Sequence, residues 1–228
     1  MQICHCAGSQ ADSGCEPGSM ATSISPRRPV SGKQLRADRT RSMVVDETVR
    51  CIIEEGFGAA SAKHITERAG VTWGVIQYHF GDRDGLLMAV VDEGFGRLLE
   101  TLRGMEPELG STAGYARVEI VVSAIAEAFL SPTSVAALEI LIATRSARAD
   151  PDQRHLLELF STLTRLGGYV ADGLGPERAD AVGNLIWTTL MGAMVAKMAV
   201  PGPVDVSREL HALTDVIAVY CSAASSRS

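Results

Sequence analysis

The segment of this sequence whose residues could do chemistry runs from Ser61 to Arg83 and reads SAKHITERAGVTWGVIQYHFGDR. Its apolar residues follow helical spacing on either side of Gly70, which predicts two short helices joined by a tight turn. When those apolar residues pack inward, the second helix presents these side chains outward: Thr72, Trp73, Val75, Gln77 and Tyr78. A two-turn helix can enter a major groove about 12 Å wide, so the expected chemistry is recognition of phosphates and base edges.

The rest of the sequence offers no catalytic constellation. It contains no nucleophile–base pair, no paired-carboxylate motif and no phosphate-binding loop, so an all-helical enzyme is the disfavoured alternative. Cys4 and Cys6 flank His5, but no second pair stands at zinc-finger spacing. Cys51 and Cys221 fall in apolar helical patterns, which predicts burial. We therefore expect no catalytic residue, no cofactor and no metal, and the cysteine usage fits a reducing cytoplasm.

Neighbouring helices must position the outward-facing helix. The preceding helix begins near Thr40 and carries one apolar stripe made of Val45, Val49, Ile52 and Ile53. Gly-Phe-Gly at 56–58 ends that helix, and Ser61 is a suitable N-cap for the next one. Gly81-Asp82 then opens a long leucine-rich helix. The residues expected in the core of the helix pair, and not in contact with DNA, are Ile65, Ala69, Val71, Ile76 and Phe80.

This order of elements resembles the DNA-binding domain of the TetR family of transcriptional regulators. The resemblance covers roughly residues 40 to 90, and it includes Ala-Gly-Val-Thr at 69–72 and Gly-Val-Ile-x-Tyr-His-Phe-Gly at 74–81. It implies an all-α fold with an N-terminal three-helix helix-turn-helix DNA-binding domain plus a C-terminal helical ligand-binding and dimerisation domain. The C-terminal portion resembles the family only in its helical architecture.

The resemblance also implies roles for single residues in DNA binding. Ser61 would cap the second helix and contact a phosphate, and Lys63 would reach the backbone or a base edge. Thr72 would cap the recognition helix, while Arg83 would meet a phosphate at the start of the fourth helix. The other family positions on the recognition helix are held by Trp73, Gly74, Val75, Tyr78 and His79.

Several of these positions keep two interpretations. Gln77 stands where the family commonly has a phosphate-contacting tyrosine, and glutamine can donate to a phosphate or read adenine. Trp73 and Val75 could pack on thymine methyl groups, but an exposed Trp73 beside Tyr78 could instead anchor a protein partner. His79 is either a phosphate donor or a packing residue. The alternative function is therefore a helical protein-binding adaptor without DNA activity.

Composition sets the predicted domain limits. Residues 1–38 are rich in Ser, Gly, Ala and Pro, which predicts a disordered, partly basic leader in which Met20 could be the true start. Six basic residues lie from Arg27 to Arg41 against one acid, so this run, ending in Arg41, either touches DNA phosphates or keeps the tail solvated. The predicted domains are 39–84 for DNA binding, 85–222 for ligand binding and dimerisation, and 223–228 for a disordered tail.

Five helices are predicted beyond Met105, near 113–130, 133–148, 152–172, 176–199 and 206–222. The last two are rich in small and apolar residues on more than one side, which predicts a two-fold four-helix interface in a homodimer. The longest uncharged stretch, Ala181–Ala196, is too short and too polar for a membrane span, so a buried helix is expected and no membrane partner.

The predicted partners are double-stranded operator DNA and a small effector. The effector is expected to be apolar, because the middle helices carry little charge. The candidate lining residues of an effector pocket are Phe129, Leu141, Phe160, Leu166, Trp187 and Met191. The resemblance implies a repressor that binds a palindromic operator as a dimer and is released when the effector tilts the fourth helix. The sign of regulation, repression or activation, is left open by the residues themselves.

Overall fold

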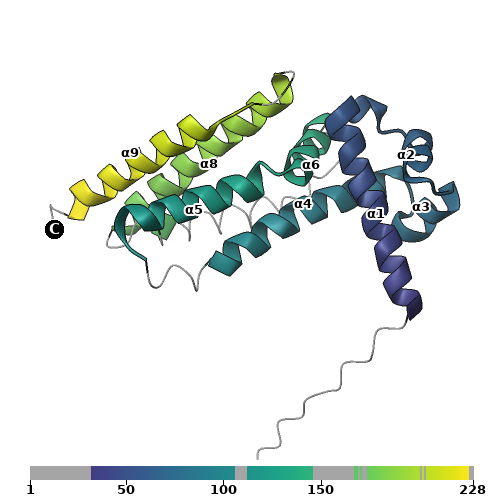
Figure 1. Cartoon of the computed structure of the whole chain (residues 1–228), viewed down its shortest axis with the longest axis horizontal. Coiled ribbons are helices and arrows are strands. Elements are labelled where there is room, and N and C mark those ends of the chain that lie inside the picture. The colour runs from purple at the N-terminus through teal and green to yellow at the C-terminus, as the bar shows by residue number, and fades with distance from the viewer. Residues whose placement is uncertain are drawn as a thin grey trace, which may run out of the picture.

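The computed structural model describes residues 32–105, 112–145, 167–168, 170, 174–200, 202 and 204–225. Every regular element within these residues is helical, which confirms the all-α prediction. One end of the molecule is a head made of α1 (Gly32–Glu55), the 3₁₀ turn η1 (Phe57–Ala59), α2 (Ala62–Ala69) and α3 (Trp73–Phe80). The head lies at the opposite end from the C-terminus (Figure 1).

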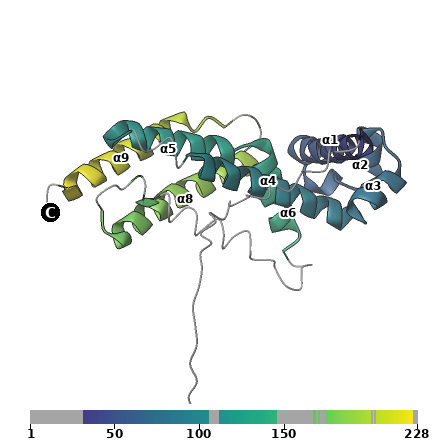
Figure 2. The same ribbon diagram turned by 90° about the horizontal axis from the view of Figure 1, so that it is seen from below.

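The body of the molecule continues from α4 (Arg83–Met105), which runs out of the head as one unbroken helix. The other helices of the body are α5 (Gly114–Phe129), α6 (Pro132–Ala143), α8 (Pro176–Ala199) and α9 (Ser207–Ser225). Figure 2 shows that α4 and α6 form the connection between the head and the far end, where α5, α8 and α9 lie. The predicted domain boundary after residue 84 therefore falls inside the first turn of a continuous helix.

The head is held by a small apolar core in which the helix pair packs on α1. Ile65 of α2 and Ile76 of α3 are fully buried, as predicted, against Val45 and Ile52 of α1 and the start of α4. Gly70 ends α2 with φ of +64°, a left-handed conformation that glycine adopts without steric cost, and this turn sets the angle between α2 and α3. Burial of the two isoleucines decides which face of α3 remains outside.

The body is held by close packing of α4 on α6. Gly94 of α4 lies so near α6 that a Cβ on it would come within 3.0 Å of the Ala137 Cβ and 3.1 Å of the Thr133 carbonyl oxygen. A larger residue at Gly94 would have to push the two helices apart, because both neighbouring atoms belong to a packed helix. The same α4–α6 pair reaches the head at one end, so the body and the head share a continuous core.

The ends of two helices differ from the predicted limits. α1 begins at Gly32, so the prediction of a leader through residue 38 is wrong for its last seven residues. α9 continues to Ser225, so the predicted tail 223–228 begins inside a helix. These end turns project beyond the core and carry no apolar stripe, which is the signal that the periodicity analysis needs. Ile53 was likewise assigned to the buried stripe but is 45% exposed.

The remaining helix predictions are close to the observed limits. α5 and α8 match the predicted 113–130 and 176–199 within two residues, while α6 stops at Ala143, five residues before the predicted end. Most of the predicted helix 152–172 lies outside the described residues. Among the residues described, no single helix is long and apolar enough to cross a membrane. Only α5 and α6 taken together have the length and composition of a membrane span, and this pair is bent by 59°.

Candidate nucleic-acid interface

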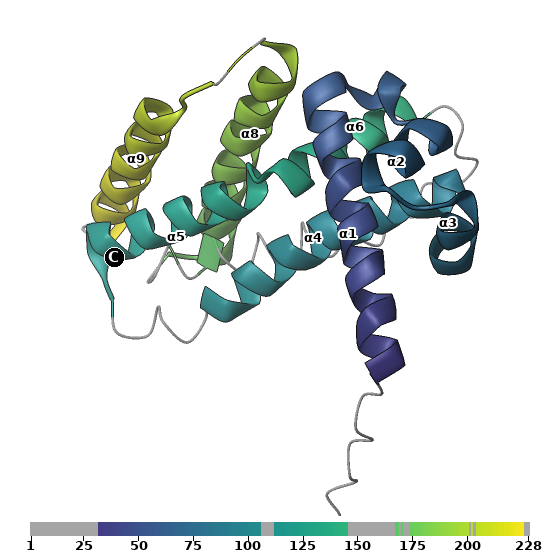
Figure 3. The same cartoon turned by 45° about the vertical axis from the view of Figure 1, so that its right-hand side comes forward.

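The helix α3 presents an uncovered face at the outer edge of the head. Trp73 is 40% exposed and Tyr78 is 77% exposed, although both are large apolar rings. Gln77 is also exposed, and Ile76 alone on this helix is fully buried. Figure 3 shows α2 and α3 at the far side of the head from α8 and α9. The described C-terminal helices therefore leave this face accessible.

The first residues of α3 leave room for close approach from outside. Thr72 occupies the N-cap position with extended backbone, but its side chain makes no capping hydrogen bond to the helix. A Cβ built on Gly74 would meet only the Thr72 hydroxyl oxygen, at 3.8 Å, so the chain itself does not require a glycine there. Val75 behind them is half-buried. The first turn of α3 thus combines the amide groups of a helix N-terminus, a hydroxyl group and a bare backbone patch.

The start of α2 lies beside this face. Ser61 is the N-cap, as predicted, and its hydroxyl oxygen accepts a hydrogen bond from the His64 amide at 3.2 Å. Lys63 projects into solvent with 86% of its side chain exposed, and its Nζ lies 3.8 Å from a Glu67 carboxylate oxygen. An exposed pair of this kind is weak, so Lys63 can exchange Glu67 for a phosphate at little cost.

Arg41 and Arg83 are tied to aromatic rings of the head. Arg83 donates from Nε to the Ala60 carbonyl oxygen at 2.8 Å, and its guanidinium carbon lies 5.2 Å from the centre of the Phe57 ring. Arg41 lies in the same way over Phe80, at 5.3 Å. Arg83 therefore holds the α1–α2 turn against α4, a structural role beside the phosphate contact that the resemblance implies.

His79 packs between two aromatic neighbours. Its ring meets the ring of Tyr78 edge to face, with centroids 4.8 Å apart, and lies 6.0 Å from the ring of Phe80. The histidine is half-buried, so it supports the position of Tyr78 from behind.

An ion-pair cluster that the sequence analysis missed locks α2 onto α1. Arg68 of α2 donates from Nε to Glu47 and from Nη2 to Glu54, both at 2.7 Å, and from Nη1 to Glu55. These hydrogen bonds raise the pKa of Arg68. The hydrogen bond that Glu55 accepts from Arg68 is the main cause that lowers the pKa of Glu55. The Nε2 atom of His64 lies 2.9 Å from the other Glu55 oxygen. The partners are 9 to 21 residues apart, so no local spacing signals them.

A second missed contact joins the head to the body. The backbone N–H of Phe57 donates to the Glu139 carboxylate of α6 at 2.7 Å. The two residues are 82 positions apart in the sequence. α6 therefore supplies the acceptor for an amide in the turn that precedes α2.

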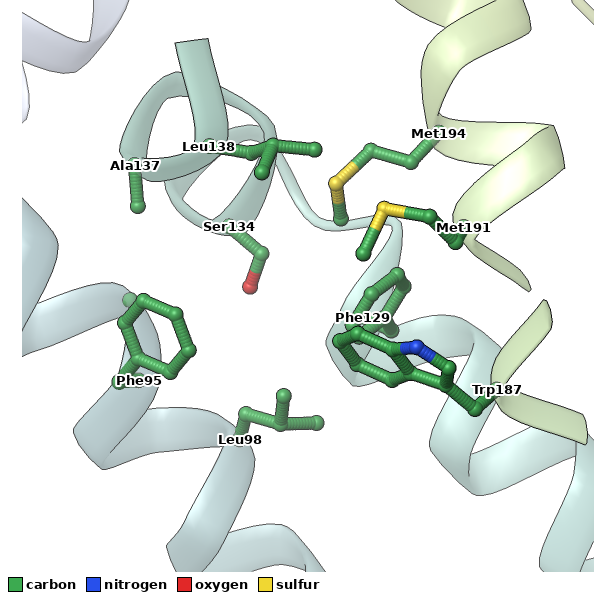
Figure 4. Close-up of a pocket in the computed structure, with 10 residues that line it drawn as sticks. Phe95, Leu98, Phe129, Ser134, Ala137, Leu138, Trp187, Met191 and Met194 are labelled. Atoms are coloured by element: carbon green, nitrogen blue, oxygen red, sulfur yellow. The ribbon is translucent and has the colours of Figure 1, made fainter. Parts of the chain in front are cut away.

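An apolar cavity of about 30 Å³ lies in the body between α4, α5, α6 and α8. Three of the predicted lining residues, Phe129, Trp187 and Met191, do line it, and Phe129 meets Trp187 edge to face at 5.2 Å. Leu141 does not line it, and this correction follows from its place on α6, one turn beyond Leu138. Phe160 and Leu166 lie outside the described residues. The additional lining residues (Figure 4) are Gly94, Phe95, Leu98, Ser134, Ala137, Leu138 and Met194.

Comparison with known proteins places the head in a family. Residues 44–90 match the model described as bacterial regulatory proteins, tetR family. The chain is 25% identical over 179 residues to the HTH-type transcriptional regulator BetI of Burkholderia thailandensis, covering 78% of this chain and 91% of that protein. It is 31% identical over 80 residues to the HTH-type transcriptional repressor AcnR of Corynebacterium glutamicum, which covers 30% of this chain and 43% of AcnR.

Solved structures share the fold of about four fifths of the chain. A TetR transcription regulator from Haloarcula marismortui superposes with a TM-score of 0.60 at 16% identity, covering 82% of this chain and 98% of that one. The fatty acid degradation regulator FadR of Bacillus halodurans superposes with a TM-score of 0.60 at 17% identity, covering 78% of this chain and 94% of that one. Residues 44–90 therefore match the DNA-binding domain of the tetR family of bacterial regulatory proteins, and the solved structures share the fold of head and body.

Proposed function

We propose that this chain is a ligand-responsive repressor that binds palindromic operator DNA as a homodimer and is released by a small apolar effector. The observation that carries the proposal is the uncovered face of α3, where Trp73 and Tyr78 stand exposed on a helix held from behind by Ile76. Two large rings in water are unfavourable in isolation and are expected to meet a partner. Binding to DNA would take place in the cytoplasm.

The residues of this face suit different parts of a duplex. Trp73 and Val75 offer apolar surface for thymine methyl groups, and Gln77 offers both a donor and an acceptor for adenine. Thr72, Ser61 and Lys63 stand around the rim, where hydroxyl and ammonium groups contact phosphates and fix the register. The exposed Tyr78 would extend this phosphate contact from the end of α3.

The proposed dimer interface uses apolar side chains of α8 and α9 that one protomer leaves in water. The large ones that are at least 40% exposed are Leu185 and Val195 on α8 and Val216, Val219 and Tyr220 on α9. Two copies of this helix pair related by a two-fold axis would bury these side chains as a four-helix interface. Pairing also supports function, because two short recognition helices reach useful affinity only across half-sites about one DNA turn apart.

The proposed effector site is the apolar cavity of α4, α5, α6 and α8. Its volume of about 30 Å³ is far below the roughly 300 to 1,000 Å³ typical of a ligand pocket, so an effector must spread the helices that line it. Met191 and Met194 are flexible enough to give way without losing contact. Because α4 and α6 both line the cavity and both reach the head, spreading them would change the separation of the two α3 helices in a dimer.

A gel-shift titration with DNA from upstream of the gene tests the proposal. We expect specific, salt-dependent binding, and a loss of about tenfold or more in affinity, equivalent to about 1.4 kcal/mol, for Trp73→Ala. The matched control is Ile120→Ala on α5, whose side chain is 39% exposed compared with 40% for Trp73. Absence of specific binding across many upstream fragments, or equal loss in both variants, would contradict the proposed interface and favour a protein-binding adaptor.

A further inference from the structure

The junction between α1 and α2 brings together three side chains with metal-binding chemistry. Cys51 and Glu55 are four residues apart on α1, so they share one face of that helix, and the face is turned toward α2. His64 stands in the first turn of α2. The sequence analysis predicted no metal site, because these residues have no metal-ligand spacing along the chain and only the packing of α2 on α1 assembles them.

The three donor atoms are close enough for one ion. The Cys51 sulfur, a Glu55 carboxylate oxygen and a His64 ring nitrogen all lie within 4.8 Å of one another, and the Glu55 Oε2 to His64 Nε2 distance is 2.9 Å. Tetrahedral Zn²⁺ with bonds of about 2.0 Å to N and O and about 2.3 Å to S needs donor separations of about 3.5 Å. Side-chain rotations that move the donor atoms by on the order of 1 Å would supply that geometry.

The junction has one side that is buried and one side that faces solvent. Cys51 is fully buried, with 0% exposure, while the side chains of Glu55 and His64 are each 36% exposed. An ion held by the three groups would face solvent on the side of the histidine and the carboxylate and protein on the side of the thiol. Water on the solvent-facing side would be the fourth ligand.

The charge of the surroundings favours a cation. Three carboxylates, those of Glu47, Glu54 and Glu55, face the guanidinium groups of Arg68 and Arg50, which leaves an excess of negative charge. Arg68 holds the Oε1 oxygen of Glu55 and leaves Oε2 directed at His64. A metal ion would take the place of the proton between Glu55 and His64, and Arg68 would continue to orient the carboxylate.

We propose that Cys51, Glu55 and His64 form a binding site for a divalent cation of the zinc type. A thiolate and an imidazole select borderline-soft ions such as Zn²⁺ and Co²⁺, whereas Mg²⁺ and Ca²⁺ take oxygen ligands. The thiolate is the form of cysteine that binds a metal, so ion binding would release the Cys51 thiol proton. A bound ion would cross-link α1 to α2 within the DNA-binding head.

The experiment is a Co²⁺ titration of the full chain, followed by absorbance. Because Cys4, Cys6 and His5 could also bind metal, the starting protein carries serine in place of every cysteine except Cys51. We expect one Co²⁺ per chain, a near-ultraviolet thiolate-to-cobalt charge-transfer band, the visible bands of tetrahedral Co²⁺, and displacement of Co²⁺ by Zn²⁺.

Variants in that background identify the ligands. Cys51→Ser should abolish the charge-transfer band, and His64→Gln should weaken Co²⁺ binding by at least about tenfold while keeping the amide that donates to Ser61. Circular dichroism verifies that each variant keeps its helices. No band in the starting protein, or a band unchanged by both substitutions in folded protein, would overturn the proposal.

Discussion

The hydrogen bond between Phe57 and Glu139 gives the sharpest prediction about what joins the body to the head. The Phe57 N–H is half-buried, and its acceptor is the carboxylate of Glu139 at 2.7 Å. Glu139→Ala leaves this amide without its acceptor, and an unsatisfied buried donor costs about 1 to 3 kcal/mol. Because solvent partly reaches the site, we expect a loss of about 1 to 2 kcal/mol in the free energy of unfolding.

Thermal and urea unfolding at one fixed protomer concentration measure this loss. For a chain of this length it corresponds to a fall in Tm of about 2 to 8 °C. Glu139→Gln keeps an acceptor oxygen and should lose less than half as much. The control is Glu100→Ala, which removes an exposed carboxylate from α4. If Glu139→Ala unfolds at the same temperature as Glu100→Ala, the assigned contribution of the bond is refuted.

The same variant tests transmission from the proposed effector cavity. Ser134, Ala137 and Leu138 of α6 line that cavity, and Glu139 follows them directly. If α6 carries the signal, Glu139→Ala should bind operator DNA but show a smaller effector-induced loss of affinity than the wild type. An unchanged effector response would contradict transmission through Glu139 of α6.

Three further predictions concern acid stability, effector binding and assembly. The folded-state pKa of Glu55 lies below its ordinary value of 4.5, so the stabilisation from its ion pairs is present above that pH and is lost as the pH falls. Between about pH 5 and about pH 3, the Tm of the wild type should therefore fall more steeply than that of Glu55→Gln. In Trp73→Phe the only tryptophan left is Trp187, so apolar effectors should change its fluorescence and charged metabolites should not. Val219→Glu should yield monomers by light scattering, whereas Ile142→Glu, an exposed site on α6, should not; a dimeric Val219→Glu would contradict the proposed interface.

The helices of the body were predictable where an apolar stripe marks them. α8 begins at Pro176, which suits the first helical position, and both of its limits were predicted correctly. The first turns of α1, from Gly32, were not predictable in this way, because they extend past the core and carry polar residues. Periodicity reports burial, so it detects only those parts of a helix that the protein covers.

The outward face of α3 was decided by the sequence alone. Once Ile76 must be buried and Gly70 must turn the chain, the helical period leaves Trp73, Gln77 and Tyr78 outside. That argument uses only neighbours within about two turns, which local sequence contains. The resemblance to the TetR family rests on the same local positions.

Contacts between distant segments were decided only by the tertiary structure. Arg83 on the Ala60 carbonyl, Arg68 among three glutamates, and Glu139 on the Phe57 amide each join elements whose distance and orientation no local pattern encodes. The same holds for Cys51 and His64, which are 13 residues apart and meet only because α2 packs on α1. Spacing along the chain determines which side of a helix a residue occupies, whereas the choice of partner depends on how separate helices pack against one another.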